Sequence, residues 1–138
     1  MTRAVRAIEN YAKTFNHKDA FKLSNASITD AGAATLAATL PGSRVESLLL
    51  SGNAVGDAGA VALAAVLPDT PNLRELVLSG NKVSDAGARA LLAALPNSRM
   101  AHVDLCGGFS VAKGRIADAT KARLREVKNA DGETVRFS

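Results

Sequence analysis

The sequence is poor in cysteine and in aromatic residues. Its 138 residues contain one cysteine, no tryptophan, one tyrosine and four phenylalanines. Because Cys106 has no second cysteine to pair with, no disulfide can form within this chain, which favours a reducing, intracellular compartment and the cytoplasm first of all. A core with so few aromatic residues must be built from Leu, Val, Ile and Ala. The 47% hydrophobic content is enough for one such domain.

The sequence also lacks the long apolar runs that mark membrane and secretory proteins. No stretch of 18 or more residues is apolar throughout, so we expect no membrane span. Arg3, Arg6 and Glu9 interrupt the N-terminal segment where a secretory signal would need an unbroken apolar region. The same arginine-containing segment is compatible with a mitochondrial transit peptide, so a mitochondrial location is the alternative to a cytoplasmic one.

The net charge of +4 is unevenly distributed. Residues 1–22 and residues 111–138 each carry a net charge of +3, whereas residues 23–110 carry −2. A nucleic-acid-binding protein would more often concentrate its positive charge on one face of the body. Nucleic acid is therefore the weaker hypothesis for the partner, and another protein is the stronger one.

A repeat of 28 residues is the main pattern of the chain. The stretch Leu48–Gly59 is followed 28 positions later by the nearly identical stretch Leu76–Gly87. A weaker copy begins at Phe21, 27 positions before Leu48. A fixed period of this length is typical of a stacked solenoid.

One repeat predicts a strand, a turn and a helix. Leu48 and Leu50 are two positions apart, which places both side chains on one side of a short strand. Leu63 and Leu67 are four positions apart, which places them on one face of a helix.

The residues around each predicted helix agree with this division. Helix N-caps are expected at Asp30, Asp57 and Asp85. Prolines that cannot continue a helix follow at Pro41, Pro68 and Pro96 and limit each helix to about ten residues. Glycines that would allow close approach to a neighbouring helix recur at Gly32, Gly59 and Gly87.

This pattern resembles the leucine-rich-repeat family, in particular its intracellular, ribonuclease-inhibitor-like subclass. The resemblance implies an α/β fold: a right-handed solenoid of about three full repeats plus caps, with short parallel strands on the concave side and helices on the convex side. It also implies that Asn53 and Asn81 bond the neighbouring loops in a ladder. Ala26 and Gly108 occupy the same slot in the outer repeats, so the predicted ladder has two rungs.

The chain divides into three parts on this interpretation. Residues 1–20 are expected to form an N-terminal capping helix, because apolar side chains recur there at helical spacing. Residues 21–105 hold the leucine-rich repeats. Residues 106–138 are expected to form an irregular last repeat and a C-terminal cap, with a helix from about Ala112 to Lys128 and a fifth strand that contains Val135 and Phe137.

No motif in the sequence indicates catalysis or a cofactor. The stretch Ser110–Lys113 fits a four-residue Ser-x-x-Lys pattern, but its companion motifs are absent. His17 and His102 do not have the spacing of a zinc site with Cys106. We therefore expect no enzyme activity, no cofactor and no metal.

The residues between the core leucines are the candidate functional surface. They alternate with the leucines along each strand and so face the concave side. The candidate partner-binding residues are Lys22, Ser47, Leu49, Ser51, Glu75, Val77, Ser79, His102, Asp104 and Arg136. The central column across the sheet is expected to run Lys22, Leu49, Val77, Asp104, Arg136. An apolar centre with a polar rim is how protein-binding patches are built, although isolated exposed apolar residues are also common on any protein.

The sequence predicts a non-enzymatic protein–protein interaction module or scaffold, a subunit or adaptor of a larger assembly. One alternative is a ribosome- or RNA-associated accessory protein that uses its basic ends, and another is a host-directed microbial effector. The sequence leaves open whether the concave face or the basic ends bind the partner.

Overall fold

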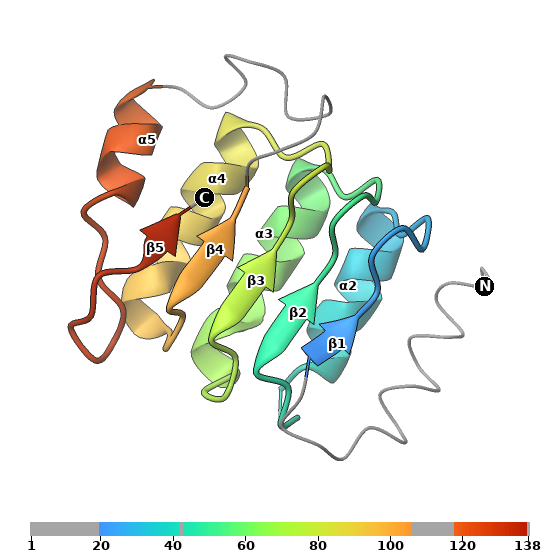
Figure 1. Cartoon of the computed structure of the whole chain (residues 1–138), viewed down its shortest axis with the longest axis horizontal. Coiled ribbons are helices and arrows are strands. Elements are labelled where there is room, and N and C mark those ends of the chain that lie inside the picture. The colour runs from blue at the N-terminus through green and yellow to red at the C-terminus, as the bar shows by residue number, and fades with distance from the viewer. Residues whose placement is uncertain (1–19, 42, 106–117, 138) are drawn as a thin grey trace.

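The computed structural model describes residues 20–41, 43–105 and 118–137. Five short strands form one parallel sheet in sequence order (Figure 1). The strands are β1 (Ala20–Lys22), β2 (Ser47–Leu49), β3 (Glu75–Val77), β4 (His102–Asp104) and β5 (Arg136–Phe137). The helices are α2 (Asp30–Thr39), α3 (Asp57–Val66), α4 (Asp85–Ala94) and α5 (Asp118–Leu124). Within the described ranges, α2, α3 and α4 lie behind one face of the sheet, so the repeats form two layers, and α5 lies next to α4 at the end of the helix row (Figure 1).

The core lies between the sheet and the helices. The strand leucines Leu48, Leu50, Leu76 and Leu78 are fully buried, as the two-residue period predicts. Buried helix side chains one turn apart pack against these leucines, for example Leu63 of α3 and Leu67 directly after it. Aliphatic side chains that interdigitate between the two layers supply the hydrophobic stabilisation of each repeat.

Each of the three repeat helices is ten residues long, as predicted. Pro68 and Pro96 each occupy the second position of a short 3-10 turn that follows α3 and α4. Proline has no backbone N–H to donate, so the α-helical bonding pattern ends before it.

The predicted asparagine ladder is confirmed. Asn53 Oδ1 accepts hydrogen bonds from the backbone N–H groups of Ala26 (2.9 Å) and Ile28 (3.0 Å), and Asn53 Nδ2 donates to the carbonyls of Leu23 and Leu50 (2.9 Å each). One side chain thereby satisfies four backbone groups in two consecutive repeats.

Asn81 repeats this arrangement one unit later. Its Oδ1 accepts from Val55 N–H (3.0 Å), and its Nδ2 donates to the carbonyls of Leu50 (2.7 Å) and Leu78 (3.1 Å). In the first repeat, Asn25 takes the left-handed backbone position that Gly52 and Gly80 hold in the next two, with φ of 55° against 70°. Asparagine tolerates this conformation better than most residues, which explains why it stands one position before the ladder slot.

The prediction that each aspartate caps its own helix is wrong. The helices begin at the aspartates themselves, and Thr29, Gly56 and Ser84 are the N-cap residues, none with a side-chain capping bond. The aspartate reaches across to the next repeat instead. Asp30 Oδ1 accepts from the backbone N–H groups of Gly56 (2.7 Å) and Gly59 (2.9 Å) at the start of α3.

Asp57 makes the same bonds to the start of α4. Its Oδ1 accepts from the backbone N–H groups of Ser84 (2.7 Å) and Gly87 (3.0 Å), and its Oδ2 accepts from the Ser84 hydroxyl. The N-termini of neighbouring helices lie side by side, so a carboxylate in one first turn lies next to the unpaired N–H groups of the next helix.

The recurring glycines permit this contact. A Cβ atom on Gly59 would lie 2.8 Å from Asp30 Oδ1 and 3.0 Å from the Cβ of Ala33. A Cβ atom on Gly87 would lie 2.7 Å from Asp57 Oδ1 and 3.0 Å from the Cβ of Ala60. The prediction that these glycines allow close approach is confirmed. Each glycine leaves room for the aspartate carboxylate of the preceding repeat as well as for the neighbouring helix.

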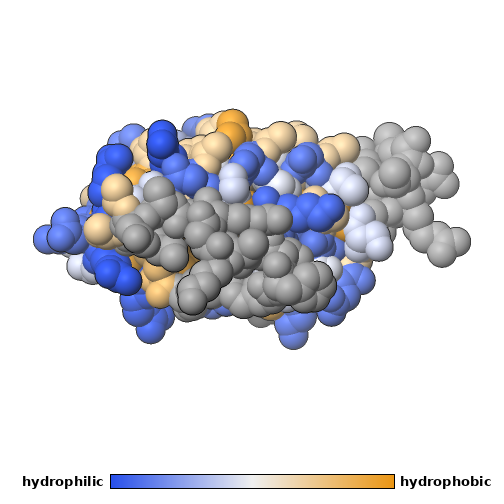
Figure 2. All heavy atoms as spheres, turned by 90° about the horizontal axis from the view of Figure 1, so that it is seen from above, coloured by the Kyte–Doolittle hydropathy of each residue, from blue (hydrophilic) through white to orange (hydrophobic). Residues whose placement is uncertain are grey.

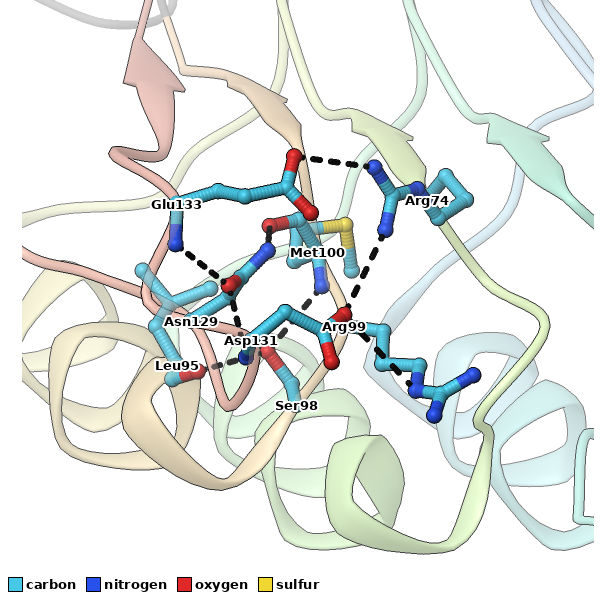
Figure 3. A network of polar contacts seen from close by, with 8 residues as sticks. All are labelled: Arg74, Leu95, Ser98, Arg99, Met100, Asn129, Asp131 and Glu133. Carbon is cyan, nitrogen blue, oxygen red and sulfur yellow. Dashed lines mark hydrogen bonds and ion pairs between the residues drawn. The ribbon is translucent and has the colours of Figure 1, made fainter.

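The C-terminal segment returns to the sheet after α5. The helix ends at Leu124, four residues before the predicted end at Lys128, because the chain then turns toward the sheet. The buried Asn129 closes the predicted turn: its Oδ1 accepts from the N–H groups of Asp131 (2.9 Å) and Glu133 (3.0 Å), and its Nδ2 donates to the carbonyl of Met100 (3.0 Å) (Figure 3). The predicted fifth strand follows as β5.

Several predictions concern residues outside the described ranges. They are residues 1–19 of the capping helix predicted for residues 1–20, His17, Cys106, the Gly108 slot, the segment 110–113 and the start of the helix predicted at Ala112. Ala20, the last residue of the predicted cap, is the first residue of β1.

We expect Asn81→Ala to lower the free energy of unfolding by about 3 kcal/mol. The substitution would leave the amide of Val55 and the carbonyl of Leu78 without this partner in a site where Asn81 is 0% exposed, and each unpaired buried group costs about 1–3 kcal/mol. The carbonyl of Leu50 would keep its bond from Asn53 Nδ2. Urea unfolding measures the loss. The matched control Asn97→Ala, at an exposed position in a 3-10 turn, should change stability by no more than about 0.5 kcal/mol. Equal losses for the two variants would contradict the ladder.

We expect Gly59→Ala to destabilise the protein by about 1–3 kcal/mol, because the added methyl group would overlap the Asp30 carboxylate and Ala33. Gly56→Ala is the control: a Cβ there would meet the same carboxylate at an ordinary contact distance of 3.4 Å. Thermal and urea unfolding of both variants would decide the matter, and a larger loss for Gly56→Ala would refute the proposed role of the glycine.

Candidate functional site

The sheet face turned away from the helices carries the predicted partner-binding residues, and we call it the concave face. Strand pairing places Lys22 beside Leu49, Leu49 beside Val77, and Val77 beside Asp104. These four residues form the central column, as predicted. Lys22 is exposed, whereas Leu49, Val77 and Asp104 are half-buried.

The predicted place of Arg136 in the central column is wrong. Arg136 pairs with His102, two positions before Asp104 on β4, and so continues the neighbouring column of Ser47, Glu75 and His102. The loop between α5 and β5 sets this register, and it does not follow the repeat. Because side chains alternate with a period of two, the shift by two residues leaves Arg136 on the concave face.

Small hydroxyl side chains lie beside the apolar centre. Ser47 flanks Leu49 along β2, and Ser51 and Ser79 follow Leu49 and Val77 at the strand exits. The hydroxyls of Ser24 and Ser51 bond each other at 2.9 Å. Leu49 therefore has only short side chains beside it along β2, whereas Val77 has a short one on its exit side and Glu75 on the other.

The side of the concave face toward β4 and β5 carries charges of both signs. His102 Nδ1 lies 3.1 Å from Glu75 Oε2, so these two side chains bridge β3 and β4. Asp104 lies one alternation further along β4, and the exposed Arg136 lies beside His102. Lys22 stands alone at the opposite edge, and it forms no salt bridge with any residue in the described ranges.

The outer surface of the helices is apolar, which the sequence reasoning overlooked. Every exposed side chain in the middle of α2 and α3 is an alanine, except Val61, which is 49% exposed. On α4 the exposed Arg89 pairs with Asp85 at 2.8 Å. Figure 2 shows these apolar side chains along its upper rim, over the helices. Alanines at a three- to four-residue spacing after each aspartate are the signal that could have predicted this surface.

The charges at the C-terminal end fall into two groups. Arg74 lies 3.4 Å from Glu133 and 3.9 Å from Asp131, and Arg99 lies 3.8 Å from Asp131, so an acidic loop neutralises two arginines of the repeats (Figure 3). Exposed ion pairs of this kind stabilise by at most about 1 kcal/mol. Solvent-exposed cations lie on and after α5 at Arg123, Arg125 and Lys128.

The described part of the chain contains no group of three or more His, Cys, Asp or Glu side chains that could hold a metal ion. None of its helices is long and apolar enough to cross a membrane.

Repeated strand–turn–helix units, a parallel sheet in sequence order and a buried asparagine at each regular turn define the class of protein: a solenoid built from leucine-rich repeats. The family model "Leucine Rich repeat" matches residues 45–64 and 71–92, which are the second and third units. These two matches and the repeated units of the fold support a leucine-rich-repeat solenoid. No curated protein matches the sequence significantly.

The fold is also found among solved structures. One similar structure, described as "Leiomodin-1 Actin-Binding Site 2 (ABS2)", superposes with a TM-score of 0.79 at 16% sequence identity, and the match covers 100% of this chain and 79% of that one. At this identity the similarity establishes the leucine-rich-repeat fold and does not extend to the partner.

Proposed function

We propose that this protein is a non-enzymatic protein–protein interaction module that binds its partner on the concave face, as a subunit or adaptor of a larger assembly. The observation that carries the proposal is the central column, in which Leu49 and Val77 lie side by side between polar and charged residues. Neither side chain contributes to the buried core, which the alternate leucines form. Small apolar patches with a polar rim are typical of binding surfaces.

We further propose that the protein belongs to the ribonuclease-inhibitor-like subclass of the family. Unit lengths of 27 and 28 residues and a full ten-residue α-helix in each of three units support this assignment. We also propose that residues 1–20 and 106–138 cap the repeats of residues 21–105. In favour of the second cap, Asn129 bonds Met100, and Ala130 N–H donates to Ser98 C=O at 2.7 Å.

Actin is the first partner to test, because the similar solved structure is described as an actin-binding site. Co-sedimentation with filamentous actin and titration with monomeric actin are direct measurements. A negative result would exclude actin as the partner but not the proposal of an interaction module. Affinity capture from native lysate followed by mass spectrometry would then test for other protein partners.

RNA contact through the basic C-terminal end is the second candidate, supported by the exposure of Arg123, Arg125 and Lys128. RNA binding of this kind would weaken steeply between low and moderate salt. Absence of binding at every salt concentration would dismiss it.

We expect the double substitution Leu49→Asp and Val77→Asp to weaken capture of the partner by more than about tenfold, because two charges would replace the apolar centre of the surface. Circular dichroism should be unchanged, since both side chains lie outside the core. The control is Val61→Asp, which places the same charge on the outer surface of α3 and should leave capture unaltered. If the double variant captured the partner normally, the concave face would not be the binding site.

A further inference from the structure

The spacing of the central column limits the shape of a partner that could lie along it. The column takes one residue from each strand, and neighbouring strands are about 4.8 Å apart. Side chains on one face of an extended chain are about 6.6–6.8 Å apart, which is too long a step for this column. Side chains three or four positions apart on an α-helix are about 5–6 Å apart, and the helical repeat is therefore the closer match.

The relief of the surface also suits a helix. Serines flank Leu49 on both sides along β2 and Val77 on its exit side, and Glu75 precedes Val77. A rod of about 10 Å diameter can approach both apolar side chains from the side of the serines. The longer side chains of Glu75, His102 and Arg136 gather toward one end of the neighbouring column. They would border the rod on one side there without covering the apolar pair.

The charges at the two ends of the central column determine which end of a bound helix should be acidic. Lys22 is exposed at the β1 end, next to Leu49, and has no salt-bridge partner among the described residues. The other end of the column is Asp104, which lies beside Val77. A carboxylate of the partner is therefore favoured beside Lys22 and disfavoured beyond Val77.

We propose that the concave face binds an amphipathic α-helix of a partner protein that lies across the strands. Two apolar residues of that helix, one turn apart, pack on Leu49 and Val77, and an acidic residue one further turn along pairs with Lys22. This inference rests on the proposed function and specifies the partner chemistry of the same surface.

Selection from two peptide libraries tests the shape. One library displays 15-residue alanine-based helices randomised along one face, and the other displays extended eight-residue peptides with a proline at alternate positions. We expect the protein to enrich helices that carry one acidic and two apolar residues at consecutive steps of three or four along one face, with the acidic residue at either end of the three. Enrichment of extended peptides alone, or of helices without the acidic position, would overturn the proposal.

A charge exchange tests the direction with the selected helix as the probe. Lys22→Glu should weaken its binding about three- to tenfold, and replacing the acidic residue of the probe by lysine should restore binding to that variant. Lys82→Glu is the control, because Lys82 is exposed but lies on the loop before α4 rather than on a strand. An equal effect of the two protein variants, or no restoration, would show that Lys22 does not orient the helix.

The same reagents separate this inference from the proposed function. If Leu49→Asp with Val77→Asp abolishes capture of the natural partner while only extended peptides are enriched, the helix is refuted and the interaction surface stands. If the selected helices and the natural partner both bind this double variant normally, the concave-face proposal fails as well.

Discussion

The fold depends on the pairing of backbone groups between one repeat and the next. A strand that turns sharply into a helix leaves several amides and carbonyls inside the protein, and the repeat itself cannot satisfy them. Asn53 and Asn81 bond backbone groups of the preceding repeat, and Asp30 and Asp57 bond the helix start of the following one. Side-chain-to-backbone hydrogen bonds thus connect each repeat both to the one before it and to the one after it. Burial of the leucines adds the hydrophobic stabilisation between them.

The sequence was sufficient for the features that depend on spacing within a single repeat. The strands, the buried leucines, the helix lengths and the two asparagines could all be predicted, because each rests on the spacing of a few residues within one unit. The target of Asp57 could not be predicted, since the N–H groups of Ser84 and Gly87 come close only after the repeats stack. The register of Arg136 was missed for a related reason: the loop before β5 lies outside the repeat and obeys no period.

The sequence predicts which residues lie on the concave face, but it predicts less well how exposed each of them is. All ten residues come from strands or strand exits, so alternation alone places them on the concave face. Alternation does not say how far the serines leave Leu49 and Val77 open, and both side chains are half-buried rather than fully exposed. For the exposed alanines around Val61, the sequence reasoning missed the surface itself. Alanine is a common helix former, so its recurrence in the sequence did not indicate an exposed apolar face.

The directional bridges made by Asp30 and Asp57 have a consequence for the length of the protein. Asp30 completes α3 and Asp57 completes α4, so a helix of this type is finished by the unit before it. A duplicated unit of 27 or 28 residues would bring one acceptor for its successor and present one helix start to its predecessor. Every bridge would then remain closed, whereas duplication of part of a unit would leave an aspartate or a helix start without its counterpart. Growth or shortening of the solenoid in whole units is therefore the change in length that its bonding allows at least cost.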